Sequence, residues 1–243
     1  MHPSDPRADW PQPRRRFNAA LLALSLGACT SYRGAQPFSA QSLRPTSRAF
    51  EGPYRPPEGT VWGGIDLMTS RDASSPGNPL VLAGRLLDTS GRPQAGLELQ
   101  VWQANSSGRY DYHPGETPGH GRPDAAFRGY GQSEVDSEGW YAFRTIRPVG
   151  YRRTLFGVVP WTFVPHIHVA VRSGGRDLLL TQVDLDEVAA RRPALAFADH
   201  TALMRSEGMR RLVAATGSAA VAEAGTPAGA ELIRFDIVLE NTR

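Results

Sequence analysis

Short runs of alternating apolar and polar residues fill most of the chain from residue 79 onward. Successive side chains of a β-strand point to opposite faces, so this alternation is typical of strands with one buried face. Six segments read as strands: 80–88, 97–103, 140–146, 164–171, 177–184 and 232–239. Turn segments lie between some of them: residues 89–93 follow the first strand and residues 136–139 precede the strand 140–146. The pattern predicts an all-β fold, an antiparallel β-sandwich with long loops.

Residues 186–223 interrupt this pattern because they are rich in Ala and Arg. The spacing of their larger apolar residues suits short helices better than strands. These residues are Val188, Leu195, Leu203, Met204, Leu212 and Val213. We therefore expect a short helical insertion before the last strand of the sandwich.

The first 28 residues have the features of an export signal. Residues 14–17, Arg-Arg-Arg-Phe, precede a short apolar run, and small residues precede Cys29. A basic head, an apolar stretch too short to span a bilayer and a small-residue cleavage site are typical of secretory signals. The head resembles a twin-arginine signal, and residues 26–29, Leu-Gly-Ala-Cys, resemble a lipobox whose Cys receives a lipid anchor. The alternative is an ordinary signal peptide with a chance Cys.

This interpretation divides the chain into three parts. We expect a signal peptide over residues 1–28, a tether and irregular arm over 29–60, and the sandwich domain over 61–243. Residues 29–60 are rich in Ser, Pro, Gly, Arg and Gln without a clear period, which favours a tether. The predicted location is the periplasmic side of a bacterial membrane, with an anchor at Cys29.

The charge and the cysteine content of the chain exclude some classes of partner and of metal site. The net charge is +3, every basic residue is Arg, and the basic residues form no cluster that would indicate a nucleic-acid partner. Cys29 is the sole cysteine, so the chain can form neither an internal disulfide nor a cysteine-based metal site.

The predicted strand 164–171 contains the pair His166 and His168. Residues two apart in a strand point to the same face, so both imidazoles can bind one metal ion. For a His-x-His pair taken alone, the alternative is a half-buried polar strand face.

A metal site needs further ligands besides this pair. The candidates are Tyr110, Tyr112, His113, His120 and Tyr151. A phenolate is a hard, charged oxygen donor that suits Fe(III), and two phenolates with two imidazoles would leave a coordination position open. The alternative for each tyrosine is a packed aromatic ring with a satisfied hydroxyl.

A series of motifs runs in order from residue 84 to residue 168. The motifs are Gly84-Arg85-Leu86-Leu87-Asp88, Gly91-Arg92-Pro93, Val101-Trp102-Gln103-Ala104-Asn105, Gly108-Arg109-Tyr110, Phe127-Arg128-Gly129, Asp136-Ser137-Glu138-Gly139, Tyr141-Ala142-Phe143-Arg144-Thr145-Ile146 and Pro165-His166-Ile167-His168. The closing segment 235–239, Phe-Asp-Ile-Val-Leu, fits the same series. Together these motifs resemble the intradiol ring-cleavage dioxygenases, most of all the protocatechuate 3,4-dioxygenase group.

The resemblance implies a non-haem Fe(III) cofactor held by two tyrosines and two histidines. Carried over by motif, these are Tyr110, Tyr151, His166 and His168, with Tyr112 as the rival of Tyr110 because it would face the same way in an extended segment. The resemblance also implies that Tyr151 leaves the iron when a catechol binds and helps to take its proton. The ring is then opened with O2 to a cis,cis-muconate.

The chain departs from the family beside the histidines. Phe163 stands where the family has an Arg three residues before the first His. Because Phe carries no charge and donates no hydrogen bond, it cannot stabilise charge on the substrate. Arg152 or Arg153 could take over this role, and Gln182 lies near the place of a family Gln that supports the substrate. We therefore take Tyr151, Gln182 and Arg153 as candidate catalytic residues.

The sequence thus predicts an exported Fe(III) intradiol dioxygenase for a catechol-type, protocatechuate-like aromatic. The first alternative is a non-catalytic sandwich that binds iron or catecholates without turnover, and the second is a metal-free structural sandwich. The catechol and hydroxyquinol branches carry a helical domain before the sandwich, and the stretch before residue 79 has no room for one. The chain therefore favours the protocatechuate-like branch, as a homo-oligomer or a monomer.

Overall fold

The computed structural model describes residues 42–69, 76–113, 118–119, 122–155, 158–185, 202–205, 219–225 and 229–240. The predicted signal peptide, Cys29 and most of the predicted helical insertion lie outside these residues. Within the described part of the chain, no helix is long and apolar enough to cross a membrane.

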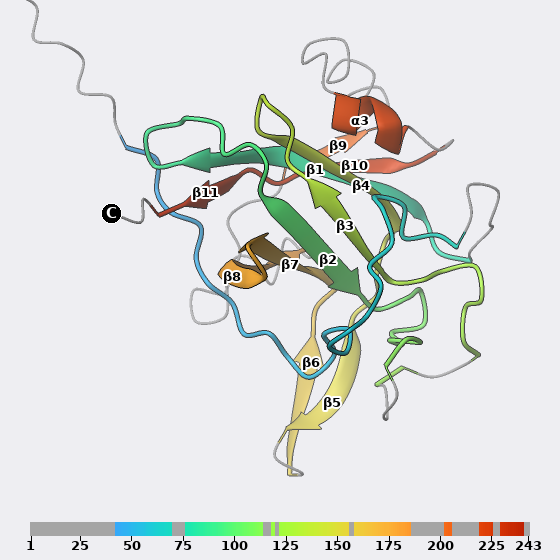
Figure 1. Cartoon of the computed structure of the whole chain (residues 1–243). Coiled ribbons are helices and arrows are strands. Elements are labelled where there is room, and N and C mark those ends of the chain that lie inside the picture. The colour runs from blue at the N-terminus through green and yellow to red at the C-terminus, as the bar shows by residue number, and fades with distance from the viewer. Residues whose placement is uncertain are drawn as a thin grey trace, which may run out of the picture. The chain divides into compact units, whose positions relative to one another are not determined.

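The first sheet is built around the long strand β1 (Pro79–Asp88) (Figure 1). This strand pairs antiparallel with β4 (Trp140–Ile146) on one side. On the other side it pairs parallel with β10 (Glu231–Arg234) and then with β11 (Ile237–Leu239). β9 (Ala202–Arg205) continues the sheet beyond β10 by antiparallel pairing.

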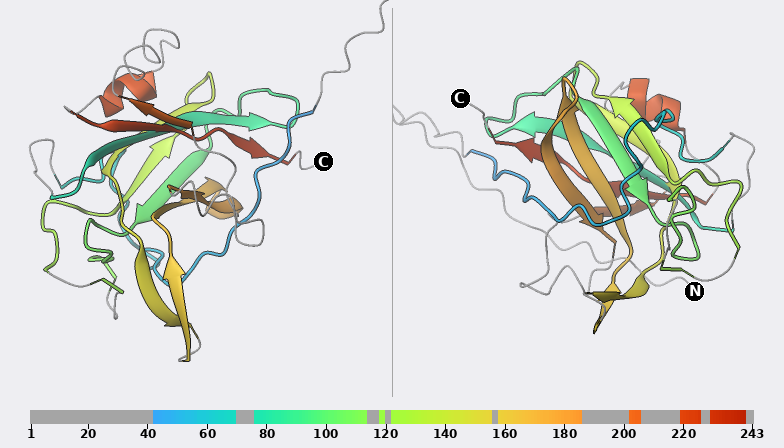
Figure 2. Two further views of the ribbon diagram at one scale, coloured as in Figure 1. Left: turned by 180° about the vertical axis from the view of Figure 1, so that it is seen from behind. Right: turned by 60° about the horizontal axis from the view of Figure 1, so that its bottom comes forward.

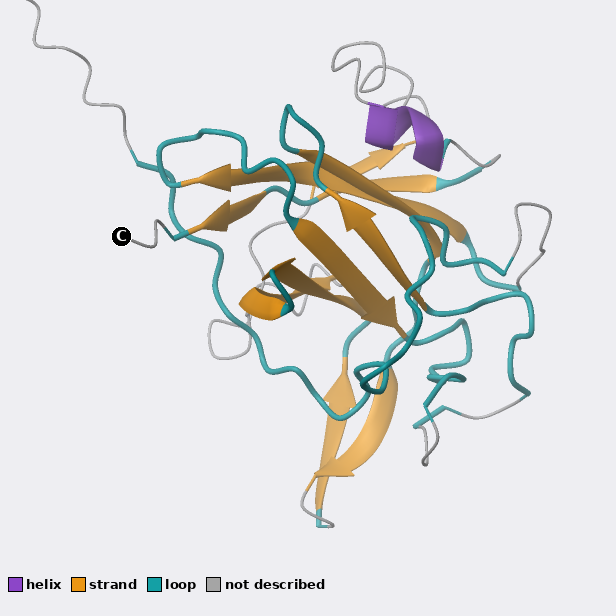
Figure 3. Cartoon of the chain, in the orientation of Figure 1, coloured by secondary structure: helices purple, strands orange, loops and turns teal. Residues whose placement is uncertain are grey.

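The second sheet contains four strands and is antiparallel throughout. Its order is β3 (Tyr130–Glu134), β2 (Glu98–Gln103), β7 (His166–Ser173) and β8 (Arg176–Asp184). The described residues contain one short helix, α3 (Ala219–Ala224), before β10, and strands dominate the rest (Figure 3). The all-β sandwich and the helix before the final strand are confirmed.

A two-stranded ribbon links β4 to β7. Its strands are β5 (Tyr151–Leu155) and β6 (Val159–Phe163), which pair only with each other. Figures 1 and 2 show this hairpin extending away from the two sheets. Tyr151 begins its first strand and Phe163 ends its second, so the base of the hairpin lies next to the start of β7.

Three expectations for the strands are corrected. Leu203 and Met204, assigned above to a helical insertion, lie in β9 and pair with Ile233 and Leu232. The single closing strand 232–239 is divided into β10 and β11, and at the break the side-chain carboxylate of Asp236 accepts a hydrogen bond from the backbone N–H of Arg85 in β1. The sheet is also mixed rather than purely antiparallel, since both of these strands run parallel to β1.

The two sheets pack face to face around one apolar core. Alternation along the strands sends one set of side chains inward, namely Leu80, Leu82, Leu99, Val101, Tyr141, Phe143, Ile167 and Val169. All of these are buried, and removing them from water supplies the main driving force for packing the sheets. On β2 and β7 the alternate positions, including Trp102, His166 and His168, therefore point to the outer face of the second sheet.

An irregular arm over residues 42–66 covers the open edges and the outer face. Thr46 bonds Val238 of β11 through both its N–H and its side-chain oxygen. The N–H of Ala49 donates to the carbonyl of Leu180 in β8. The arm thus satisfies backbone groups at the edge of each sheet, where unpaired groups would otherwise invite association with other chains.

Candidate functional site

His166 and His168 form the fixed part of the site. Their Nε2 atoms are 3.2 Å apart, and each side chain is only 4% exposed. Ile167, between them, is buried in the core and holds the strand in place. The Nδ1 of His166 lies 2.6 Å from the Val164 carbonyl, to which it donates, so its Nε2 is left with a free lone pair.

Tyr110 reaches the histidines from a tight loop after β2. The side chain of Asn105 organises this loop by accepting hydrogen bonds from the N–H groups of Ser107 and Arg109. Gly108 has a φ of 78°, which glycine adopts without the steric cost that a side chain would add. The Gly-Arg-Tyr motif therefore serves to turn the chain so that the fully buried Tyr110 ring enters the site.

Four potential donor atoms converge at this point. The Tyr110 hydroxyl lies 3.3 Å from the Tyr151 hydroxyl and 3.5 Å from the His166 Nε2. Metal–ligand bonds of about 2.1 Å, at angles of 90–120°, place neighbouring donor atoms roughly 3.0–3.6 Å apart. The spacing of these donors therefore fits a single metal ion bound among them.

Burial sets the charge of the site in the absence of a metal. It raises the pKa of the Tyr151 hydroxyl to about 12 and the pKa of Tyr110 well above its usual range. Burial also lowers the pKa of His166 and holds that of His168 far below its usual value. All four groups are thus neutral near pH 7, and the two imidazoles are in the form that binds metals.

The chemistry of the donors points to a hard, highly charged cation. Within the described residues, no three His, Cys, Asp or Glu side chains gather in a way that could hold a metal. The phenolic oxygens must therefore complete the set. A bound cation would offset the effect of burial on the tyrosines by favouring their phenolate forms. Two phenolates and two imidazoles suit Fe(III), so the residues fit the cofactor that the sequence predicts.

Aromatic rings surround the donor set. Two of them, Tyr54 and Trp102, were not predicted from the sequence as part of the site. Tyr54 of the arm is buried and stacks on Tyr110, with ring centroids 4.5 Å apart. Trp102 of β2 stacks on His168 at 5.0 Å, as expected from its place opposite His168 in the sheet. The hydroxyl of Tyr112 donates to the Tyr54 carbonyl at 2.9 Å. Tyr112 therefore supports the arm, whereas Tyr110 supplies a donor atom.

The remaining predicted residues surround this centre in different ways. Gln182 of β8 lies directly opposite His168, but its amide donates to Asp184 at 2.7 Å. Phe163, which replaces the family Arg, stacks on Tyr151 at 5.0 Å. Arg153 extends over the ring of Tyr54, with its guanidinium carbon 5.1 Å from the ring centroid. Phe163 thus contacts the ring of a donor residue, Gln182 is in register with His168, and Arg153 lies one aromatic ring away from the donors.

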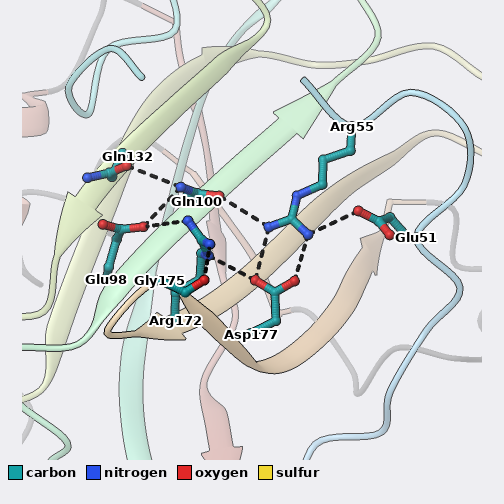
Figure 4. A network of polar contacts seen from close by, with 8 residues as sticks. All are labelled: Glu51, Arg55, Glu98, Gln100, Gln132, Arg172, Gly175 and Asp177. Atoms are coloured by element: carbon teal, nitrogen blue, oxygen red, sulfur yellow. Dashed lines mark hydrogen bonds and ion pairs between the residues drawn. The ribbon is translucent and has the colours of Figure 1, made fainter. Parts of the chain in front are cut away.

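A polar network fastens the arm to the second sheet (Figure 4). Arg55 makes two hydrogen bonds to Asp177, at 2.6 and 3.0 Å, and one to Glu51 at 3.0 Å. Its guanidinium also lies over the Trp102 ring, 5.3 Å from the centroid. Asp177 accepts a further bond from Arg172. Because Tyr54 precedes Arg55, this network also holds Tyr54 against Tyr110.

We expect Asp177→Asn to lower the free energy of unfolding by about 1 kcal/mol at pH 7, a typical value for a partly exposed ion pair of good geometry. The hydrogen bond from Arg55 lowers the pKa of Asp177 in the folded state. Its contribution is therefore complete above the unfolded-state pKa of about 3.9 and is lost as the pH falls through the folded-state value. Urea unfolding at pH 7 and pH 3 measures the difference.

Glu58→Gln is the matched control for this prediction. Glu58 is an exposed carboxylate of the same arm and has no ion pair among the described residues. We expect this substitution to change stability little at either pH. A destabilisation by Asp177→Asn that stays constant between pH 7 and pH 3 would contradict the assigned role of the charge.

Comparisons with known proteins identify the family and the fold of the chain. A family model described as Dioxygenase matches residues 51–241, which is most of the chain. Catechol 1,2-dioxygenase 2 of Acinetobacter lwoffii is 31% identical over 150 residues, covering 58% of this chain and 51% of that protein. The chain belongs to the intradiol dioxygenase family. The protocatechuate 3,4-dioxygenase beta chain of Burkholderia cepacia is 35% identical over 120 residues, covering 45% of this chain and 46% of that one.

The fold likeness extends to a solved structure. The dioxygenase domain of a fusion with a carbohydrate-binding protein from Streptomyces sp. SirexAA-E matches with a TM-score of 0.51 and 23% identity. The match covers 82% of this chain and 100% of that domain. The chain spans about half the length of the curated relatives that it matches. The comparisons therefore give its family and fold, as an intradiol dioxygenase sandwich.

Proposed function

We propose that this protein is a non-haem Fe(III) intradiol dioxygenase that opens the ring of a catechol-type aromatic with O2 to a cis,cis-muconate. The observation that carries this proposal is the convergence of the Tyr110 and Tyr151 hydroxyls with the Nε2 atoms of His166 and His168. Family membership supports the reaction class. The names of two relatives, for catechol and protocatechuate, support an aromatic with two adjacent hydroxyl groups.

Bound Fe(III) would supply a Lewis acid and a template for the substrate. Tyr110, Tyr151, His166 and His168 would hold it. Tyr151 is the candidate to take a proton from the substrate, because its side chain is 8% exposed whereas Tyr110 is fully buried. It also lies at the base of the β5–β6 hairpin, where the chain leaves the sheets.

Other side chains would orient the substrate and exclude water. Gln182, beside His168, and Arg153, beside Tyr54, are the candidate polar contacts. The rings of Tyr54, Trp102 and Phe163 form apolar walls around the donors. Such walls suit a flat aromatic substrate and strengthen electrostatic interactions inside the site by keeping water out.

The test combines colour with oxygen uptake. Purified protein loaded with Fe(III) should turn red-brown through charge transfer from tyrosinate, and catechols should shift this absorption under anaerobic conditions. On admission of air, an oxygen electrode should record one O2 consumed for each muconate formed. Protein that stays colourless after loading would contradict the metal site. A catechol-induced shift without oxygen uptake would instead identify a binding module.

A further inference from the structure

Two arginines lie over aromatic rings near the donor set. One of them is paired with carboxylates, and the other is not. Arg55 lies over Trp102, and its charge is neutralised by Asp177 and Glu51. Arg153 lies over Tyr54 at a similar distance, 5.1 Å. Among the described residues, Arg153 has no carboxylate within ion-pair distance. Its positive charge is therefore exposed and uncompensated at the edge of the site.

The register of the hairpin directs Arg153 toward the site and its neighbour away from it. Tyr151 and Arg153 are two residues apart in β5, so they share a face, whereas Arg152 lies on the opposite face. Tyr54, which Arg153 contacts, stacks directly on Tyr110. The guanidinium thus lies one aromatic ring away from the candidate metal ligands.

We propose that Arg153 selects catechols that carry a carboxylate on the ring, by binding that carboxylate outside the reacting carbons. This inference rests on the proposed function. A guanidinium presents its N–H groups in a planar fork that matches the two oxygens of a carboxylate. The contact with Tyr54 orients the guanidinium before binding, which reduces the entropy lost on binding. Within the described part of the chain, no ion pair of Arg153 has to be broken first.

Binding of the ring carboxylate and stabilisation of charge on the reacting atoms have different effects on neutral and anionic catechols. A group that stabilises charge on the reacting atoms would be needed equally by neutral and anionic catechols. A group that binds the ring carboxylate distinguishes the two, and it acts mainly on KM. A residue that merely clamps the arm through Tyr54 would affect both substrates alike.

The experiment compares 3,4-dihydroxybenzoate with 3,4-dihydroxybenzamide, which match in shape and differ in charge. For the iron-loaded wild-type protein we expect kcat/KM to favour the benzoate by about 10- to 100-fold, through a lower KM, as is typical for a charged hydrogen-bonded contact. Arg153→Gln should bring this ratio close to one. Arg153→Lys should keep part of the preference, because it retains the charge but loses the fork.

Arg152→Gln is the matched control, with the same loss of charge one residue away on the other face of the hairpin. It should leave the benzoate-to-benzamide ratio unchanged. A wild-type ratio near one, or an equal loss with both substrates in Arg153→Gln, would overturn the proposal.

A binding measurement tests the role of Arg153 independently of whether the protein turns over catechols. Calorimetric titration with 4-hydroxybenzoate and 4-hydroxybenzamide, with and without Fe(III), measures the preference for the carboxylate without turnover. If no catechol is turned over, the proposed function fails and this binding ratio alone decides the role of Arg153. A preference for the benzoate that Arg153→Gln removes supports the proposal, and equal binding of the two compounds contradicts it.

Discussion

Tyr110→Phe should lower the affinity for Fe(III) by more than about 100-fold and remove much of the tyrosinate-to-iron absorption. Loss of a supporting group outside the ligand set costs roughly 10- to 100-fold in metal affinity, and loss of a ligand should cost more. The Phe ring keeps the stacking contact with Tyr54, so the apolar wall of the site is preserved. Competition with a chelator and the visible spectrum measure the two effects.

Tyr112→Phe is the control for this substitution. It removes a hydroxyl from the same loop, but that hydroxyl binds the Tyr54 carbonyl and does not face the other donors. We expect the variant to bind Fe(III) and to keep its colour. If the colour were lost in Tyr112→Phe and kept in Tyr110→Phe, the two tyrosines would have to exchange roles.

Gly84→Ala should destabilise the fold by about 3 kcal/mol, at the upper end of the usual range for an added methyl group in a packed core. A Cβ atom at Gly84 would lie 1.8 Å from the Phe235 carbonyl oxygen and 2.6 Å from its carbon. The same oxygen accepts a hydrogen bond from the buried Tyr141 hydroxyl, so it cannot move without breaking that bond. Urea unfolding followed by circular dichroism gives the change.

Gly64→Ala provides the matched comparison. Gly64 is an exposed residue of the arm, and a Cβ atom there would meet nothing within 4 Å. We expect the free energy of unfolding to change by less than about 0.5 kcal/mol in this variant, as for surface substitutions that remove no contact. Equal stability of the two variants would show that the chain relaxes at the break between β10 and β11.

The sequence pattern predicted the elements whose signal is local. Strands β1, β2, β4, β7 and β8 are rich in apolar residues and lie within a few residues of the predicted segments. The pair His166 and His168 was evident for the same reason, since the period of a strand fixes their common face. The resemblance to a family then singled out Tyr110 and Tyr151, which alternation alone could not distinguish from other tyrosines.

The elements that were missed depend on partners far along the chain. β3 is short and polar, Gly150 directly precedes β5, and Pro160 is the second residue of β6, so the alternation of these strands is weak. The parallel pairing of β1 with β10 and β11 joins distant segments that no local pattern connects. Tyr54 sits in an irregular arm without a period, so no local pattern singled it out. Its role emerges from packing against Tyr110.

The arm pairs with a strand that lies at the other end of the domain's sequence, and this affects when the arm can fold. Thr46 is synthesised early, but the Val238 it pairs with comes 192 residues later. Contacts of such long sequence separation form late in folding because loop closure must precede them. The Thr46 end of the arm is therefore fixed only once β11 has joined the first sheet, whereas Tyr54, eight residues later, is held by the pairing of Arg55 with Asp177 of the second sheet. The start of the arm is therefore among the last parts of the domain to be fixed, although it is among the first to be synthesised.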